Sequence, residues 1–526
     1  MDSKAKRQTP PGDRISELPD EILCHLLSFL PTLHAVRTTI LSTRWNNVWC
    51  TSAPISLQFD SRDFSSGPQQ QTRFMRFVDC VIKLCGSSCN IRRLCLHCHS
   101  FAFKDEDFSR IHRWISTAIK NNVIDLDLYL FSNNNYDSFE KFEMPPSVFQ
   151  CRSLVSLKLD TNCLTYSPST SGCFPSLKYL HVTFRDYINE GRVKIFLNCP
   201  ALEDLTIVGN VGGDVLELNI SAPQMKTLTT DNLDCKFFVD APRLENLNVN
   251  IDWPSLTSNY VLENSKSLVK AKVHVKYIAP KHKHRYPSYV PNISELLAGT
   301  SSVKYLTFLA PLYLEARYLP DYENLNQLEL DLRCFCWDLV VELLKKCPSM
   351  KHLILNLHRT AWNHDYKPVN PPTLVPGCLS SHLKTVSMRG FHGEQEEVQV
   401  LKYLLHYGEV LNKITISTRN FVDSNWGELS NSVDSIRAAS LWSGGTGLQR
   451  FPSVLRISSM QERPTASESS SQQHNYSTIR MEQLLSSRPS SSRARISAEQ
   501  KEKKARREEE GKGELAKGND DGSRRL

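Results

Sequence analysis

The seven residues Ser153–Leu159, SLVSLKL, decide the fold of this 526-residue chain because they are one copy of a pattern that recurs along most of it. In the pattern x-φ-x-x-φ-x-φ, φ is an apolar residue. The last two φ positions lie two apart, which on a strand places both side chains on one face. The other copies begin at Asn90, Asn122, Ser176, Ala201, Gln224, Arg243, Ser267, Ser302, Asn324, Ser349, His382 and Val410.

The spacing of these copies indicates a repeat architecture. Twelve intervals average just under 27 residues and range from 19 to 35, and two copies are imperfect because Thr230 and Ala271 occupy apolar positions. The average lies within the roughly 20 to 29 residues of leucine-rich repeats, whose units bury their apolar pairs against one another. We therefore predict an α/β fold with a leucine-rich-repeat solenoid over residues 61–375 and helices or loops behind the strands. A generic α/β domain with coincidental strands is the alternative.

Residues 13–60 precede the repeats and contain signals for three short helices. Pro19 can begin a helix that Pro31 ends, a second helix runs to about Leu41, and Ser42 or Thr43 can cap a third. Apolar residues of the first helix cover more than the single stripe that one packed face requires. About forty residues can hardly bury enough surface to fold alone, so we expect the spare apolar face to dock on another protein or on the adjoining repeats.

The same segment resembles a known family. The matching residues are Leu18-Pro19-Asp20-Glu21-Ile22, Leu26, Ser28-Phe29-Leu30-Pro31, Ala35-Val36-Arg37-Thr38 and Leu41-Ser42-Thr43-Arg44-Trp45 with Trp49, and together they resemble the plant form of the F-box. This resemblance implies that the segment binds the Skp-type adaptor of an SCF-type (Skp-cullin-F-box) ubiquitin ligase, and through it a cullin. The implied contact or core positions are Leu18, Pro19, Ile22, Leu30, Pro31, Val36, Leu41 and Trp45.

A second resemblance covers residues 376–418, at the end of the repeats. It runs from Pro376 through Cys378-Leu379-Ser380-Ser381 to Val410-Leu411 and Lys413-Ile414-Thr415-Ile416, and it is similar to the FBD region that follows leucine-rich repeats in many plant F-box proteins. The pattern departs from that family at Tyr407-Gly408-Glu409. Together the two resemblances imply a member of the plant F-box/LRR/FBD family.

The remaining segments carry less information. Residues 1–12 are predicted to be disordered, residues 419–450 are an uncertain extension, and the Ser-rich, charged tail 451–526 is predicted to be disordered because it has too few apolar residues to offset its ordering entropy. The net charge is +7, and the tail holds 15 Lys/Arg against 11 Asp/Glu, so the rest of the chain is nearly neutral. Nucleic acid is therefore an unlikely partner. A polar start and short apolar runs predict no membrane span, and we expect a nuclear and/or cytoplasmic location.

Cys95-Leu96-His97-Cys98-His99 matches C-x-x-C-H, the spacing of covalent haem attachment. On a strand, however, Cys98 faces inward with Leu94 and Leu96 whereas Cys95 points to the other side. We interpret the segment as buried cysteine with surface histidine and predict no cofactor or metal.

We find no phosphate loop, nucleophile elbow or catalytic His/Cys/Asp spacing, so we predict a non-catalytic, substrate-recognition subunit of the ligase. A protein client is expected on strand positions that alternate with the buried leucines, chosen by strand phase alone. These positions are Asp125, Asp127, Lys158, Tyr179, His181, Asp204, Asn246, Asn248, Tyr305, Gln327, Glu329 and His352. The alternative is a non-catalytic interaction scaffold whose F-box-like helices only cap the solenoid.

Overall fold

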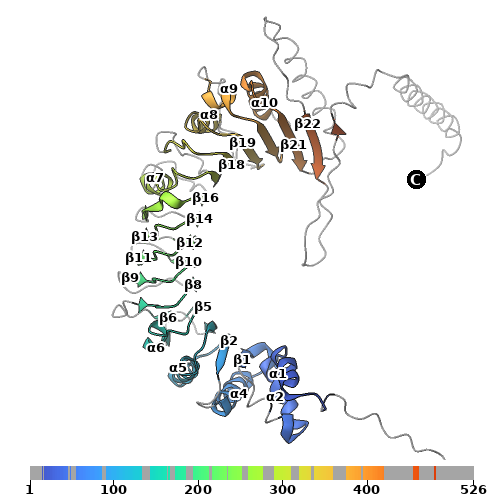
Figure 1. Ribbon diagram of the computed structural model, residues 1–526, viewed down its shortest axis with the longest axis vertical. Helices are drawn as coiled ribbons and strands as arrows, with labels where there is room; N and C mark the ends of the chain where they lie inside the picture. Colours follow the sequence, from blue (N-terminus) through green and yellow to red (C-terminus); the bar gives the residue numbers. More distant parts are fainter. Residues whose placement is uncertain are drawn as a thin grey trace, which may run out of the picture. The chain divides into compact units, whose positions relative to one another are not determined.

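The structure is a computed structural model, drawn as a ribbon in Figure 1. It falls into two compact units, residues 1–383 with 406–408 and residues 384–405 with 409–526. It describes residues 15, 17–45, 48, 55–85, 90–132, 142–162, 164–165, 172–184, 193–211, 216–233, 235–251, 259–275, 290–309, 319–332, 337–358, 375–392, 395–419, 454–460 and 479–480. The expected N-terminal segment 1–12 and, apart from Arg419, the expected extension 419–450 lie outside the described residues.

The first unit is built on a long parallel sheet in which strands pair in chain order. Its strands are β1 (Ile55–Asp60), β2 (Ile91–Phe101), β3 (Asp125–Ser132), β5 (Ser156–Thr161), β8 (Tyr179–Phe184), β10 (Asp204–Val211), β12 (Thr227–Leu233), β14 (Asn246–Ile251), β16 (Lys270–Val275), β17 (Tyr305–Leu309), β18 (Gln327–Leu332) and β19 (His352–Leu357). Two short strands, β4 (Phe142–Glu143) and β6 (Leu164–Thr165), form a separate parallel pair.

Each of the thirteen sequence copies coincides with a strand, and in twelve of them the strand begins at the fourth residue of the copy. The strand register aligns the same pattern position from one repeat to the next. Side chains at this position are at most 5% exposed. They are Leu94, Leu126, Leu157, Leu180, Leu205, Leu228, Leu247, Ala271, Leu306, Leu328 and Leu353. The predicted solenoid of parallel strands is thus confirmed.

Behind the middle repeats the chain returns through strands. β7 (Gly172–Cys173), β9 (Val193–Asn198), β11 (Leu216–Ser221), β13 (Lys236–Asp240) and β15 (Asn259–Glu263) form a second parallel sheet, where helices or loops were expected. Copies in this region are 25 residues or fewer apart. A short unit leaves few residues for the return, and an extended strand covers more distance per residue than a helix.

Helices return the chain between β1 and β2, in the repeats longer than 25 residues, and in the 25-residue repeat between β18 and β19. They are α4 (Gln70–Cys85), α5 (Asp105–Lys120), α6 (Pro146–Phe149), α7 (Val290–Ala298), α8 (Trp337–Lys345) and α9 (Gly377–Ser381), with 3₁₀ turns η2 (Ser61–Asp63) and η4 (Ser265–Ser267). In α5, Phe108, Ile111 and Trp114 are buried at helical spacing, which fixes the face packed on the sheet. None of the helices in the described residues is long and apolar enough to cross a membrane.

The N-terminal helices form as predicted, with shorter bounds. α1 (Asp20–Ser28) follows Pro19, and α2 (Thr32–Arg37) follows Pro31 and continues into the 3₁₀ turn η1 (Thr38–Ile40). Residues 43–45 are helical, and the Trp45 amide donates a hydrogen bond to the Ser42 hydroxyl at 3.3 Å, as a cap should. The segment 13–60 also includes β1, which belongs to the main sheet.

The second unit contains most of the FBD-like residues, namely 384–405 and 409–418. β20 (Thr385–Arg389) and β21 (Lys413–Arg419) are parallel, and α10 (Gln395–Tyr407) lies between them in sequence. β22 (Val454–Met460) adds to β21 in parallel, and β23 (Ile479–Arg480) adds to β22 in antiparallel orientation. Within the tail 451–526, which was predicted to be disordered, the structure describes only these two short strands. The other tail residues lie outside the described part.

Candidate functional site

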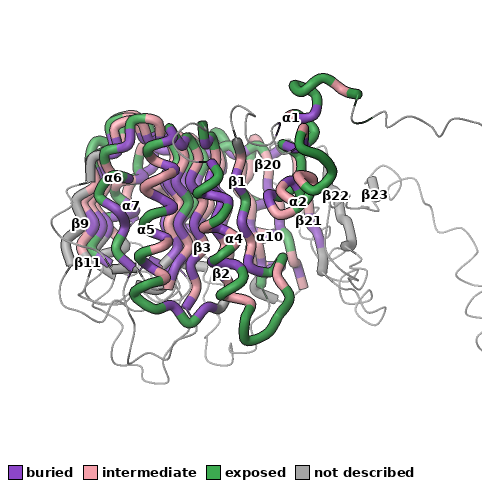
Figure 2. The backbone as a smooth tube through the Cα atoms, turned by 90° about the horizontal axis from the view of Figure 1, so that it is seen from below, coloured by how far each residue is buried: buried purple, intermediate pink, exposed green. Residues whose placement is uncertain are grey.

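The helices of residues 15–45 expose apolar side chains on a scale found nowhere else in the described chain. Twelve large apolar side chains are exposed among the described residues, and seven of them lie between residues 15 and 41. They are Ile15, Ile22, Leu26, Phe29, Leu30, Ile40 and Leu41. Figure 2 shows exposed residues along much of α1 and buried residues through the strands.

Helical spacing places three of these residues on one side of α1 and of the residue that follows it. Ile22, Leu26 and Phe29 follow one another at intervals of four and three, and Phe29 is 71% exposed. Leu23 and Leu27, one position further along, are buried and form the packed face. The helix thus has one apolar face covered by its own chain and another left open, and a contiguous open apolar face is the kind of surface that binds a partner protein.

The eight residues implied for adaptor binding divide into two groups. Pro19, Ile22, Leu30, Pro31 and Leu41 are exposed, and Leu18 and Val36 are half-buried. Trp45 is buried, so it supports the helices from within. Phe29 and Ile40, which are 71% and 88% exposed, are not among the eight implied positions, although Phe29 belongs to the F-box-like motif.

Polar contacts hold the open face in place. Arg44 donates to the Asp20 carboxylate, with Nη2 and Oδ1 2.7 Å apart, and also to the Leu18 carbonyl, which fixes the start of α1 against the third helical turn. The buried Thr32 hydroxyl accepts a hydrogen bond from the Gln58 amide at 2.6 Å. β1 is the edge strand of the main sheet, so the Gln58 N–H has no neighbouring strand to bond with on that side. Its hydrogen bond to Thr32 therefore connects α2 to the repeats.

All twelve residues expected to contact a client lie on strands of the main sheet and are exposed or half-buried. Register aligns them in two rows across the sheet: Asp125, Tyr179, Asp204, Asn246, Tyr305, Gln327 and His352 lie in one, and Asp127, Lys158, His181, Asn248 and Glu329 lie in the next. Tyr179 and Tyr305 are the only exposed large apolar side chains of these described strands.

Sequence reasoning missed a third row, two residues further along each strand. Asn356 donates to Asp331 at 2.5 Å and to Glu329 at 2.9 Å, and His274 Nε2 lies 3.5 Å from Asp331 Oδ2. These positions continue the same alternation as the twelve expected client residues, so the sequence pattern that predicted those residues also predicts the third row. Most side chains of this face are polar, and they carry both signs of charge.

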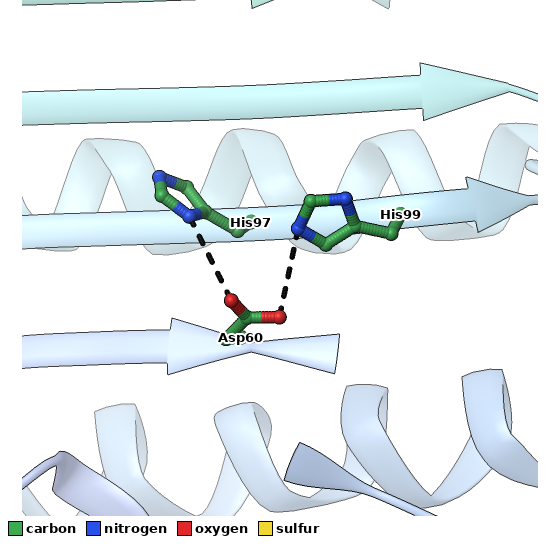
Figure 3. A group of neighbouring side chains, drawn as sticks. All are labelled: Asp60, His97 and His99. Carbon is green, nitrogen blue, oxygen red and sulfur yellow. Dashed lines mark ion pairs between the residues drawn. The ribbon is translucent and has the colours of Figure 1, made fainter. Parts of the chain in front are cut away.

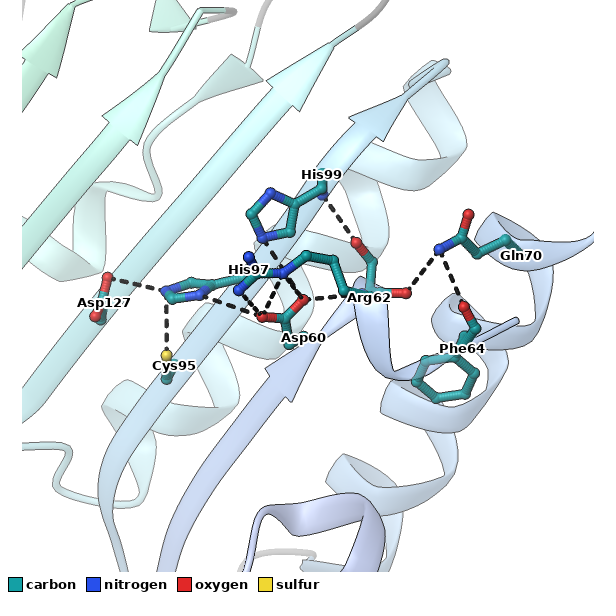
Figure 4. A network of polar contacts seen from close by, with 9 residues as sticks. Asp60, Arg62, Phe64, Gln70, Cys95, His97, His99 and Asp127 are labelled. Atoms are coloured by element: carbon teal, nitrogen blue, oxygen red, sulfur yellow. Dashed lines mark hydrogen bonds and ion pairs between the residues drawn. The ribbon is translucent and has the colours of Figure 1, made fainter. Parts of the chain in front are cut away.

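A compact polar cluster lies at the first three strands, around His97 (Figure 4). His97 Nε2 is 3.2 Å from Cys95 Sγ and 3.4 Å from Asp127 Oδ1, and its Nδ1 is 4.0 Å from Asp60 Oδ2. The Asp60 carboxylate also lies 3.5 Å from His99 Nε2, so it faces both imidazoles (Figure 3). Register explains the assembly, because Asp60 pairs with His97 and Cys95 pairs with Asp127.

Charge in this cluster is strongly coupled. The hydrogen bonds to Asp127 and then to Cys95 raise the pKa of His97 to about 10. Burial, the largest single influence, acts to raise the pKa of Asp127, but the hydrogen bond from His97 and the positive charges of His97, Lys158 and Arg93 together hold that pKa below its usual value. Burial lowers the pKa of His99. His97 is therefore an imidazolium between carboxylates at neutral pH, whereas the His99 ring is neutral.

Two sets of side chains in the described residues could hold a metal ion, Asp60 with His97 and His99, and Cys95 with His97 and Asp127. The interpretation of Cys95–His99 as buried cysteine with surface histidine fits Cys98, which is fully buried. It overlooked that Cys95, His97 and His99 alternate on one face of β2. The carboxylates come from other strands, more than 25 residues away in sequence, so spacing within β2 could not reveal them.

Comparison with known proteins agrees with both parts of the chain. A family model described as the F-box domain matches residues 15–55, and one described as the At1g61320/AtMIF1 LRR domain matches residues 85–441. The F-box/FBD/LRR-repeat protein At1g78750 of Arabidopsis thaliana is 28% identical over 423 residues, which cover 77% of this chain and 89% of that protein. The FBD-associated F-box protein At1g66310 of the same plant is 28% identical over 437 residues, covering 79% and 92%.

The repeat model alone spans more than half of the chain, the F-box model covers the open helices, and the relatives carry the FBD region in their names. The chain therefore belongs to the plant F-box/LRR/FBD family.

Proposed function

We propose that the chain is the substrate-recognition subunit of an SCF-type ubiquitin ligase. In this proposal the F-box binds a Skp-type adaptor, and through it a cullin, while the outward rows of the repeat sheet bind a protein client. The chain itself is non-catalytic. We also propose a nuclear and/or cytoplasmic location, as expected from the sequence.

One observation carries the proposal: seven exposed large apolar side chains lie within residues 15–41, on the F-box helices and the turns beside them. A helical cap whose only role is to end the solenoid would bury such residues against the repeats. Here the contact with the repeats uses α2 and the Thr32–Gln58 hydrogen bond, and it leaves Ile22, Leu30 and Leu41 exposed. This favours the ligase subunit over the scaffold whose helices only cap the solenoid.

The mechanism follows from holding two proteins together. A client bound to the repeats and a ubiquitin-charged enzyme delivered through the cullin share one assembly, so transfer to a client lysine becomes nearly intramolecular. The chain then needs no catalytic group of its own. The polar, mixed-charge face with exposed Tyr179 and Tyr305 suits a protein segment, because exposed aromatic residues in a polar surround are frequent binding anchors.

Adaptor capture tests the proposal. We expect the full chain to retain a purified Skp-type adaptor and expect Leu30→Asp and Leu41→Asp each to weaken retention by at least about tenfold, since a buried charge at an apolar interface costs more than 1.4 kcal/mol. Leu84→Asp is the matched control, because Leu84 is 59% exposed on α4, outside the F-box. The ligase assignment is wrong if the intact chain retains no adaptor.

Client binding requires a separate readout. Tyr179→Ala with Tyr305→Ala should remove co-purifying clients while adaptor capture stays unchanged. A chain lacking residues 1–60 would not serve as the adaptor-deficient control, because the deletion also removes β1 from the main sheet. Leu41→Asp is the better adaptor-deficient chain, since it leaves every strand intact.

A further inference from the structure

Three different metal-binding atoms converge on the outward face of β2 and β3. Cys95 Sγ lies 3.2 Å from His97 Nε2, His97 Nε2 lies 3.4 Å from Asp127 Oδ1, and the three atoms lie within 4.8 Å of one another. Cys95 and His97 share a face because they are two apart on a strand, and Asp127 is the register partner of Cys95. The regular sheet itself therefore fixes the arrangement.

These atoms match the coordination chemistry of zinc. Thiolate sulfur, imidazole nitrogen and carboxylate oxygen all bind Zn²⁺, at about 2.3, 2.0–2.1 and 2.0–2.2 Å. In a tetrahedron with such bonds, neighbouring ligand atoms lie about 3.3–3.7 Å apart, close to the two short separations in the cluster. We propose that Cys95, His97 and Asp127 form a binding site for a single Zn²⁺ ion, with water in the fourth position. The ion takes the place of the His97 Nε2 proton and the Cys95 thiol proton, and both protons are released to solvent.

Access to the site is compatible with an open fourth position. The side chains of His97 and Asp127 are 26% and 14% exposed, so the site is largely dehydrated and still reachable from solvent. Three protein ligands and one exchangeable position characterise open zinc sites. A group of a bound client could replace the water there, which would place the ion at the edge of the proposed client face.

Asp60 supplies the outer support that such sites use. A metal-bound imidazole usually donates its second N–H to a carboxylate, which orients the ring. Here His97 Nδ1 faces Asp60 Oδ2 at 4.0 Å while Nε2 faces the other two ligands. Arg62 holds Asp60 in place through Nη2 at 2.6 Å from Oδ2 and Nε at 3.1 Å from each oxygen. Asp60 is thus a positioning residue.

The rival set, Asp60 with His97 and His99, is weaker as a site. His99 Nε2 is shielded from solvent and has no hydrogen-bond partner in the described residues, which favours a ligand there. However, an ion in that set would compete with the Arg62 guanidinium for both Asp60 oxygens. It would also require the Nδ1 atom of His97, which is farther from its carboxylate than Nε2 is from Asp127.

Cobalt substitution distinguishes these arrangements. We would titrate the metal-free full chain with Co²⁺ and follow the thiolate-to-cobalt charge-transfer absorption, with Zn²⁺ added last as competitor. We expect Zn²⁺ to abolish an absorption that Cys95→Ser lacks and that Cys80→Ser retains. Cys80 is the matched control because its thiol is exposed on α4. Circular dichroism of each variant checks that the fold is intact.

The other variants locate the ion. His97→Gln and Asp127→Asn should each weaken binding more than Asp60→Asn, for which we expect about a 10- to 100-fold loss. Unchanged cobalt spectra in Cys95→Ser would overturn the site. So would abolition of binding by His99→Gln with Asp127→Asn unaffected, because the ion would then lie in the rival set. Adaptor capture is not involved, so failure here leaves the ligase proposal untouched.

Discussion

The F-box helices and the repeat strands use the same apolar residue types in opposite ways. Inward leucines of the strands are almost completely buried, whereas Ile40 is 88% and Leu41 65% exposed in the F-box. Each inner strand has a neighbour on both sides, so its apolar pair is covered within the chain. The F-box meets its own chain only on one side, and its other apolar face stays in water. The apolar side chains of the repeats are therefore covered by neighbouring strands of the same chain, whereas those of the open F-box face would be covered only by another protein.

The largest expected contrast is the cost of losing an apolar side chain in each region. Leu328→Ala should lower the free energy of unfolding by about 2–5 kcal/mol, because Leu328 is fully buried and a cavity would remain. Leu41→Ala should change it by less than about 0.5 kcal/mol. Urea unfolding followed by circular dichroism measures both. Equal losses would mean that the F-box face is packed in solution, and the contrast between the regions would fail.

A smaller effect is expected at the imperfect copy that contains Thr230. Its hydroxyl is buried without a hydrogen-bond partner in the described structure, and the residue is 1% exposed. Thr230→Val should raise the free energy of unfolding by about 1–3 kcal/mol, because the new methyl group fits the same space and needs no hydrogen bond. Thr229→Val, on the outward face of the same strand, is the control and should have little effect. A destabilised Thr230→Val chain would show that the hydroxyl is satisfied.

The smallest effect concerns what holds the F-box together. The Asp20–Arg44 ion pair is largely exposed, with side chains 62% and 41% accessible. A double-mutant cycle with Asp20→Asn and Arg44→Gln should give a coupling energy of about 0.2–1 kcal/mol that falls with added salt. Hydrogen exchange of the α1 amides provides the local readout. Coupling well above this range would indicate that the pair is desolvated and that the F-box is more rigid than its exposure implies.

The sequence by itself determined the features that depend on local pattern. Alternating apolar residues indicate a strand from local sequence alone. Because thirteen copies repeat the same pattern, each strand can pair with the same positions of the next copy, so the parallel sheet and its outward rows were predictable. Pro19, Pro31 and Ser42 bound the N-terminal helices for equally local reasons. A surplus of apolar residues in the first helix also indicated an open face, although not which side chains would form it.

Only the tertiary structure decided what depends on partners distant in sequence. The second sheet of the middle repeats, the membership of Ile55–Asp60 in the main sheet and the strand β22 within the tail each require a neighbouring strand that the segment itself does not encode. The cluster around His97 is the clearest case. Cys95 and His97 share a strand, but Asp60 and Asp127 reach them through pairing register, and a shift of one residue would turn either carboxylate to the opposite face.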